Sequence, residues 1–300
     1  MGRDSMSSGG RNIRGRLWAE GLIVLQSVVY GFGDPISKIA FKTVPVFSMM
    51  SVRYCIAFLV CFLFFRKRIF NTLKTVPVHA WLVPGTCMGF CYLLNNVALS
   101  MTDATSVAFL RSLSVIITPA FAFLFFGKKL RRQHLLVQIL VLPGIYMLCV
   151  KGGLSGFGAG EVVTIIAACC MAGALVFSRK NLESVDPLSM TALQAACSAV
   201  LAIAGSFIFE RGVEVHIESV KVWLIILYLA IMCTFLGYLM QNLALTEISE
   251  SHVAMLQSLC PVMTAIFSFA ILGERLSLVG VAGAAIIIIC VLIKNNIPEN

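Results

Sequence analysis

Two arginines, Arg53 and Arg111, lie within long apolar runs of the sequence. A charged side chain costs about 2.5 kcal/mol or more at the centre of a bilayer. The guanidinium group is a planar set of donors that matches a carboxylate or a phosphate. The functional interpretation is a cavity that holds an anionic group. The structural interpretation is that each arginine braces helices through backbone carbonyls or extends toward the membrane surface.

Asp34 is the one acidic residue deep in an apolar run, which makes it the candidate for binding a coupling proton. Lys38 follows one helical turn later and is a second coupling candidate, because the two can pair along a helix. Gly31, Gly33 and Pro35 predict a kinked or loosened helix around Asp34. Lys38 is alternatively a charge at the membrane surface.

Further candidates for substrate binding are polar residues in apolar surroundings. Buried amides must find hydrogen-bond partners, either on a neighbouring helix or on a ligand. Tyrosine rings can stack on a flat substrate, although packing and interfacial roles are the alternative. The amides are Asn95, Asn96, Gln194, Gln241, Asn242 and Gln257, and the tyrosines are Tyr30, Tyr92 and Tyr238.

Signals for a metal site, a cofactor or an enzyme are missing from the sequence. All eleven cysteines fall in apolar runs, where a single cysteine behaves as a small hydrophobic residue. The chain has no phosphate-binding loop of the Gly-x4-Gly-Lys-Ser/Thr type, no His-Glu-x-x-His helix and no Gly-x-Ser-x-Gly elbow. We therefore expect no catalytic residues, no bound metal and no cofactor.

The composition predicts the elements that must position these residues. The 300 residues are 59% hydrophobic and 12% charged, with a mean hydropathy of +0.94, whereas soluble domains carry about 25% charged residues. A transmembrane helix needs about 20 apolar residues. The chain offers ten such runs, at 18–40, 46–65, 79–101, 104–126, 134–150, 160–179, 187–209, 221–245, 250–272 and 277–294. We predict an all-α integral membrane protein with ten transmembrane helices.

The distribution of Lys and Arg predicts the orientation. With the N-terminus in the cytoplasm, 15 of the 23 Lys and Arg residues lie on the inside and five on the outside. Cytoplasmic loops carry such an excess, so both termini are expected to be cytoplasmic. This bias also accounts for the net charge of +9 without a nucleic-acid partner.

The sequence repeats itself. Residues 95–130 align without a gap with residues 241–276, with 13 identities that include Asn96/Asn242, Ser112/Ser258 and Gly127/Gly273. A weaker match at an offset of 141 pairs Ser48 with Ser189. In this alignment Arg53 corresponds to Gln194 and Arg111 to Gln257, so both arginines of the first half become glutamines in the second.

Five helices is an odd number, so the second copy must enter the membrane from the opposite side. We predict a cytoplasmic tail at 1–16, a first five-helix repeat at 17–151, a linker at 152–159, a second repeat at 160–294 and a tail at 295–300. Inverted repeats are typical of secondary transporters, which expose a mid-membrane site to each side in turn. A duplicated membrane scaffold without transport activity is the alternative.

Two stretches resemble the EamA domain of the drug/metabolite transporter superfamily. One runs from Ala244 to Ala265 and continues in the Gly-Glu-Arg-Leu-Ser of 273–277, and the other is its first-half copy from Ala98 to Leu130. Tyr-Gly-Phe-Gly-Asp-Pro-Ile-Ser-Lys at 30–38 and Met-Ser-Val-Arg-Tyr at 50–54 resemble the helix 1 and helix 2 patterns of this family. The resemblance implies ten helices in inverted halves around a central cavity, and transport of amino acids, sugars, nucleotide derivatives or drugs, often outward.

The chain departs from the family pattern at Gly-Lys-Lys-Leu, 127–130, where the family has Gly-Glu-x-Leu, and at Val115, where Pro261 stands in the second half. Arg111 also departs from the usual pattern and from its repeat partner, which favours a functional role. Arg53 resembles a common family residue, which favours a structural role.

We therefore predict a secondary transporter, an exporter of small metabolites such as amino acids or related carboxylates. The resemblance implies a bacterial cytoplasmic membrane. Multidrug or cation efflux by the same fold is the alternative. The expected partners are a small-molecule substrate and the lipid bilayer, and the oligomeric state is left open, a monomer included.

Overall fold

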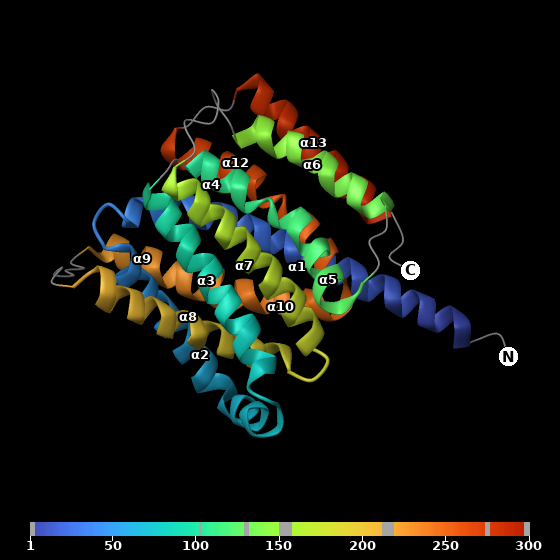
Figure 1. The fold of residues 1–300 in the computed structure, drawn as a ribbon, viewed down its shortest axis with the longest axis horizontal. Helices are drawn as coiled ribbons and strands as arrows, with labels where there is room; N and C mark the ends of the chain where they lie inside the picture. The colour runs from blue at the N-terminus through green and yellow to red at the C-terminus, as the bar shows by residue number, and fades with distance from the viewer. Residues whose placement is uncertain are drawn as a thin grey trace.

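The computed structural model describes residues 4–101, 104–128, 132–149, 158–211, 219–273 and 277–296, which form helices and short connections without a β-strand (Figure 1). The all-α membrane fold is therefore confirmed. The linker predicted at 152–159 lies outside the described residues except for its last two positions, as do residues 297–300 of the predicted tail.

In the first half, five membrane spans follow one another in the chain. They are α1 (Asp4–Ala40), α2 (Val46–Thr75), α3 (His79–Met101), the pair α4 (Ala104–Arg111) and α5 (Ser114–Phe126), and α6 (Arg132–Cys149). The second half repeats this order. Its spans are α7 (Ala159–Asn181), α8 (Pro187–Phe209), the series α9 (Val220–Tyr228), η1 (Leu229–Leu236) and α10 (Gly237–Glu247), the pair α11 (Glu250–Gln257) and α12 (Cys260–Leu272), and α13 (Leu278–Asn296).

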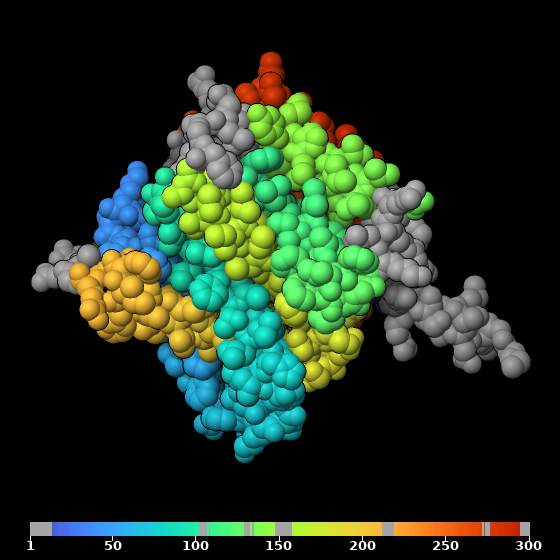
Figure 2. Space-filling model, viewed as in Figure 1, coloured from blue at the N-terminus to red at the C-terminus, as the bar shows by residue number. Residues whose placement is uncertain are grey.

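The apolar character of these helices supports the membrane assignment. Seven helical stretches of the described chain are long and apolar enough to cross a membrane, and two shorter apolar stretches lie in α6 and α13. The first span is not among the seven; Glu20, Gln26 and Asp34 lower its hydropathy. Large apolar side chains face outward, where lipid would cover them, among them Leu63, Phe64, Leu124, Val200, Phe207, Phe209 and Leu278. Figure 2 shows α3, α5, α6 and α8 closely packed across one face.

Contacts between the halves come in matched pairs. α1 of the first half packs on α10, α11 and α12, and its counterpart α7 packs on α3, α4 and α5. The counterparts α2 and α8 pack on each other, as do α6 and α13, which run side by side in Figure 1. A two-fold axis relating the two halves produces this exchange of partners, as expected for inverted repeats.

The α2–α8 pair is held at both ends by acidic side chains. At the start of α2, Glu210 accepts hydrogen bonds from the Phe47 and Ser48 backbone N–H groups, both at 2.8 Å, and from Ser48 Oγ at 2.6 Å. At the start of α8, Asp186 accepts a bond from the Ser189 N–H group at 3.1 Å and one from Arg68 Nη1 of α2 at 3.4 Å. Carboxylates satisfy the free N–H groups of a helix start and favour its dipole.

Four spans differ from the sequence-based prediction, namely spans 2, 4, 8 and 9. In α1 the helix runs without a break through Gly31, Gly33 and Pro35, and the kink around Asp34 stays a prediction. The interruptions lie in spans 4 and 9 instead, between α4 and α5 and between α11 and α12. Span 8 contains the π-helical segment η1. α2 extends to Thr75, past the predicted end at residue 65, where Phe65 has non-helical backbone angles.

Candidate functional site

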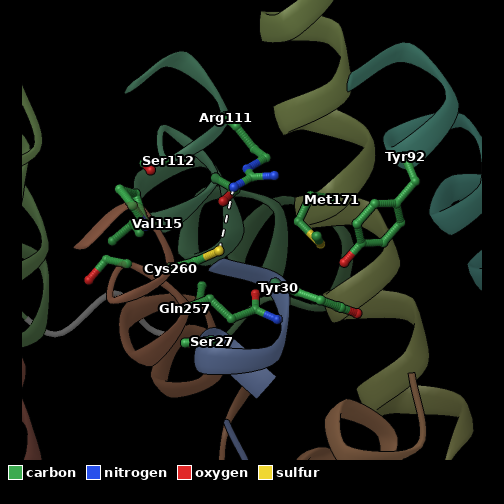
Figure 3. Close-up of a pocket in the computed structure, with 13 residues that line it drawn as sticks. Ser27, Tyr30, Tyr92, Arg111, Ser112, Val115, Met171, Gln257 and Cys260 are labelled. Carbon is green, nitrogen blue, oxygen red and sulfur yellow. Dashed lines mark hydrogen bonds between the residues drawn. The ribbon is translucent and has the colours of Figure 1, made fainter. Parts of the chain in front are cut away.

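A pocket lies between the two halves, where the broken spans 4 and 9 meet α1, α3 and α7. It encloses about 490 Å³ of space between atoms, part of which is open to solvent. The first half contributes Tyr30, Tyr92 and Arg111, and the second contributes Met171, Gln257 and Cys260. In Figure 3 these side chains converge on one space, with Arg111 and Tyr92 reaching in from α4 and α3.

A second pocket of about 350 Å³ adjoins the first, since Tyr30, Tyr92 and Arg111 line both. Its other walls include Asp34 of α1 and Arg53 of α2. Asn95 and Asn96 of α3 also line it. We call the two adjoining pockets together the central cavity. The central cavity therefore contains both arginines and the one acid that the sequence places deep in a span.

The breaks in spans 4 and 9 occur at repeat-equivalent positions, Ser112–Leu113 and Ser258–Leu259. At both breaks the backbone tightens into i→i−3 bonds: the N–H groups of Leu113 and Leu259 donate to carbonyls three residues earlier, each at 3.1 Å. Residues at such mid-helix turns often mark a functional hinge. Arg111 and Gln257 are the last residues of the half-helices α4 and α11, so each is placed beside the central cavity by its break.

Arg111 is paired with Asp34. The Arg111 Nη2 atom lies 3.3 Å from Asp34 Oδ2 and 3.5 Å from Cys260 Sγ. Thr264 Oγ1 donates to the same Asp34 oxygen at 3.0 Å. The pair therefore joins α4, α1 and α12. The predicted i,i+4 pair between Asp34 and Lys38 does not form, because Asp34 bonds across the helix interface instead.

Arg53 is buried, with 5% of its surface exposed, and its surroundings differ from those of Arg111. Its Nε donates to Thr234 Oγ1 at 2.8 Å, and its guanidinium carbon lies 5.5 Å from the Tyr54 ring centre. Thr234 stands in η1, where its hydroxyl donates to the Leu229 carbonyl at 3.0 Å. Among the described residues, no carboxylate lies within ion-pair distance of Arg53.

The glutamine that corresponds to Arg111 is held in an amide chain. Gln257 Nε2 donates to Gln241 Oε1 at 2.8 Å and to Gln26 Oε1 at 3.0 Å. Gln26 in turn donates to the Gly237 carbonyl at 2.7 Å. This chain connects α11, α10 and α1, and of its described amides only Gln257 lines the pocket.

Two other predicted site residues, Gln194 and Asn242, are fully buried outside the central cavity. Asn242 Nδ2 donates to Gln194 Oε1 at 2.8 Å and to Thr191 Oγ1 at 3.0 Å. Gln194 also donates to Ser178 Oγ at 3.0 Å. These bonds brace α7, α8 and α10. Asn96, by contrast, lines the cavity, and within the described part of the chain it donates only to the Tyr92 carbonyl of its own helix.

The predicted tyrosines form one aromatic cluster. The rings of Tyr30 and Tyr92 meet edge to face at 5.9 Å, and those of Tyr92 and Tyr238 stack at 5.5 Å. Tyr30 and Tyr92 line the central cavity, whereas Tyr238 is buried behind them. The hydroxyl groups of Tyr54, Tyr92 and Tyr238 are buried without a hydrogen-bond partner among the described residues.

The absence of a side chain at Gly237 leaves the space that the Tyr30 ring occupies. A Cβ atom at Gly237 would lie 2.7 Å from both Cε1 and Oη of Tyr30, so only glycine leaves room for the ring. Similarly, a Cβ atom at Gly33 would lie 2.8 Å from Cys233 Sγ. α1 and span 8 therefore approach each other closely at both glycines, Gly33 and Gly237.

The site contains residues that the sequence did not single out, namely Tyr54, Thr234, Cys260 and Thr264. Two signals point to them. Tyr54 directly follows Arg53, and Pro261 lacks the N–H group that would bond the Gln257 carbonyl, which marks the break beside Cys260. Thr234 and Thr264 carry no comparable signal, because single threonines are common in membrane helices.

Comparison with known proteins matches both halves. The sequence profile described as the EamA-like transporter family matches residues 17–150 and 158–295. The chain belongs to the EamA-like transporter family. The family resemblance inferred from the sequence is thereby confirmed, and as a member of this family the protein is a multi-pass membrane transporter.

Similar proteins come from archaea and bacteria. An uncharacterized transporter of Archaeoglobus fulgidus is 25% identical over 278 residues, which cover 93% of this chain and 86% of the relative. A probable amino-acid metabolite efflux pump of Salmonella typhimurium is 25% identical over 281 residues, 89% of this chain and 91% of the relative. A protein of known crystal structure superposes with a TM-score of 0.74 at 16% identity, covering 91% of this chain and 95% of that one, which shows that the two share a fold.

Proposed function

We propose that this EamA-like transporter exports small metabolites that carry a carboxylate, such as amino acids or related acids. The observation that carries the proposal is Arg53, a buried cation of the central cavity without an acidic partner among the described residues. Alternating access arises as the two inverted halves move against each other around this cavity.

A buried charge that lacks a counter-ion is strongly unfavourable. Arg53 uses Nε to bond Thr234, and its two terminal nitrogens form no hydrogen bond with the described residues. A carboxylate is the group that such a guanidinium accepts best, because two parallel N–H···O bonds form at once. A substrate carboxylate would therefore satisfy Arg53 in the bound state.

This proposal reverses the emphasis of the sequence analysis. The sequence favoured function for Arg111 and structure for Arg53. In the structure, Asp34 balances the Arg111 charge at a distance of 3.3 Å. Arg53 is therefore the arginine whose charge and terminal N–H groups are left for an anion. Both residues remain in the proposed binding site, with Arg53 as the primary carboxylate ligand.

The rest of the cavity suits the remaining polar groups of an amino acid. The Tyr92 hydroxyl, beside Tyr30, and the Asn95 Oδ1 atom are buried without a hydrogen-bond partner among the described residues, and both residues line the cavity. A hydroxyl can donate to a carboxylate, and an amide oxygen can accept from an ammonium group. Buried polar atoms without partners are rare in proteins, and a ligand would complete their bonds.

The direction and placement belong to the proposal too. Outward transport is supported by the name of the Salmonella typhimurium relative, a probable amino-acid metabolite efflux pump. The excess of Lys and Arg on one side supports cytoplasmic termini. The bacterial relatives support a bacterial cytoplasmic membrane.

The experiment is counterflow in proteoliposomes against a panel of anionic, zwitterionic and cationic metabolites. We expect saturable exchange of carboxylate-bearing compounds, and its loss in Arg53→Gln. Arg68→Gln is the matched control, since Arg68 is an exposed arginine on the same helix. Exchange of cations or neutral drugs that Arg53→Gln leaves unchanged would instead support the multidrug alternative, and no exchange of any compound would support a scaffold without transport activity.

A further inference from the structure

The ion pair between Asp34 and Arg111 lies where the two broken spans meet. Arg111 ends the half-helix α4 of span 4, and Thr264 lies in the half-helix α12 of span 9. Both bond the same Asp34 oxygen, at 3.3 Å and 3.0 Å. One carboxylate on the continuous helix α1 thus bonds a half-helix of each broken span.

We propose that Asp34 is a proton-binding site, and that a proton and the substrate carboxylate bind together and leave the cell together, with the outward gradient of the metabolite driving export. This inference rests on the proposed function, because it concerns the same cavity and the same substrate class. It adds that the coupling ion is a proton and that the proton and the carboxylate favour each other's binding.

Proton binding and carboxylate binding should strengthen each other, because the Asp34 carboxylate and the substrate carboxylate compete for the Arg111 guanidinium. While Asp34 is ionised, it occupies Arg111, and Arg53 alone is left for the substrate. When Asp34 takes up a proton, its charge is lost and Arg111 is released toward the cavity that both residues line. The cavity then presents two arginines to an anion. A proton on Asp34 therefore strengthens carboxylate binding, and by linkage the bound carboxylate strengthens proton binding by the same factor.

The surroundings of Asp34 contain no second acid among the described lining residues of the central cavity. The charged and titratable groups that face Asp34 from neighbouring helices are Arg111 of α4, Cys260 of α12, Cys233 of η1, Arg53 of α2 and Tyr92 of α3, and Tyr30 and Lys38 stand on α1 itself. Arginine stays protonated at all ordinary pH values, and lysine, tyrosine and thiol groups titrate in the alkaline range. Asp34 is therefore the one carboxylate among the described lining residues of the central cavity, and it is paired with Arg111.

A proton can reach this carboxylate. The Asp34 side chain is 27% exposed and lines the pocket of about 350 Å³, which is not sealed from solvent. The other buried acids described in α1, α7 and α11 are Glu20, Glu161 and Glu250, and none of them lines either pocket. Proton binding at Asp34 thus acts on the substrate site itself.

The test measures proton movement and carboxylate affinity together. Wild-type protein in proteoliposomes that contain a pH-sensitive dye receives a carboxylate that has given exchange in the counterflow panel. We expect protons to move with the carboxylate in the same direction. In detergent solution, carboxylate affinity should fall as the pH rises, by up to about tenfold per pH unit once Asp34 is ionised.

Asp34→Asn imitates the protonated acid. We expect it to bind the carboxylate at least as tightly as wild type at low pH, to lose the pH dependence and to move no protons, while exchange of carboxylate for carboxylate continues. Glu183→Gln, which removes an exposed acid outside the cavity, should behave as wild type. The wild-type proton measurement does not depend on the folding of any variant.

The outcomes separate the two proposals. Carboxylate exchange without proton movement, or proton movement opposite to the carboxylate, overturns the role of Asp34 and leaves the proposed function standing. An Asp34→Asn variant that keeps the wild-type pH dependence also overturns it. Absence of carboxylate exchange at every pH in wild type overturns the proposed function and this inference together.

Discussion

Arg53 and Arg111 line the same cavity, yet among the described residues only Arg111 has an acidic partner. Asp34 lies 3.3 Å from the Arg111 guanidinium, whereas the nearest polar partner of Arg53 is the neutral hydroxyl of Thr234 at 2.8 Å. The two positive charges and one negative charge leave the cavity with an excess of one positive charge. An anionic substrate group would balance it, and the residues on which this account depends can be tested one at a time.

Thr234 should position Arg53 for substrate binding. Thr234→Val removes the oxygen that accepts from Arg53 Nε and keeps the shape of the side chain. A hydrogen bond to a charged group contributes about 1.5–3 kcal/mol, so we expect KM for the carboxylate in counterflow to rise about tenfold or more. Thr234→Ser keeps the hydroxyl and should restore most of the affinity. Equal KM values in wild type and Thr234→Val would show that the bond does not position Arg53.

Gly237 should be needed for transport because it leaves room for Tyr30. In Gly237→Ala, the new methyl group would lie 2.7 Å from the Tyr30 ring and hydroxyl, so the ring must move. We expect a folded protein with strongly reduced exchange, measured by counterflow after size-exclusion chromatography. Gly21→Ala is the matched control, because no atom lies within 4 Å of the new methyl group. Wild-type exchange in Gly237→Ala would mean that the position of Tyr30 is unimportant.

Glu210 should stabilise the fold without contributing to the site. Glu210→Ala removes the acceptor for two backbone N–H groups at the start of α2. Loss of a helix cap costs about 0.5–2 kcal/mol, so we expect a lower Tm with an unchanged KM. Glu183→Ala, an exposed acid, should leave Tm close to wild type. A Tm unaffected by Glu210→Ala would contradict the capping role.

Asn242 should brace helices and not bind substrate. Its amide bonds both Gln194 and Thr191 in a fully buried position. Removing one partner of a buried hydrogen bond costs about 1–3 kcal/mol, so Asn242→Leu should lower Tm and leave KM unchanged. Its repeat partner Asn96 lines the cavity and, among the described residues, bonds only its own helix. Asn96→Leu should therefore raise KM and leave Tm unchanged. A raised KM with unchanged Tm in Asn242→Leu would show that Asn242 binds substrate and does not brace the helices.

The spans were predictable from hydropathy, because a helix in lipid needs a continuous apolar run whatever its neighbours are. The internal sequence repeat also corresponds to matching backbone conformations in the two halves. Gly127 and Gly273, identical in the alignment, both end their helices in the left-handed region, at φ of 64° and 70°. Local sequence sufficed here, since glycine adopts positive φ without steric strain.

Partners across helices were not predictable from local sequence. Lys38 lies at the right spacing for Asp34, but the partner of Asp34 is Arg111, 77 residues away. The breaks in spans 4 and 9 also escaped prediction. Pro261 marks only the second break, and Val115 at the equivalent place gives no such signal in the first. The roles of the two arginines depend on which of them reaches an acid in the folded chain, and that is a property of helix packing.

The most direct test of the central claim compares a transported carboxylate with its carboxamide in wild type and in Arg53→Gln. We predict that wild type prefers the acid by about tenfold or more, since each 1.4 kcal/mol corresponds to a tenfold change in Kd, and that Arg53→Gln loses this preference. Arg68→Gln, which changes an exposed arginine of the same helix outside the cavity, should keep the preference. An unchanged preference in Arg53→Gln would contradict the account, because the substrate carboxylate would then bind elsewhere.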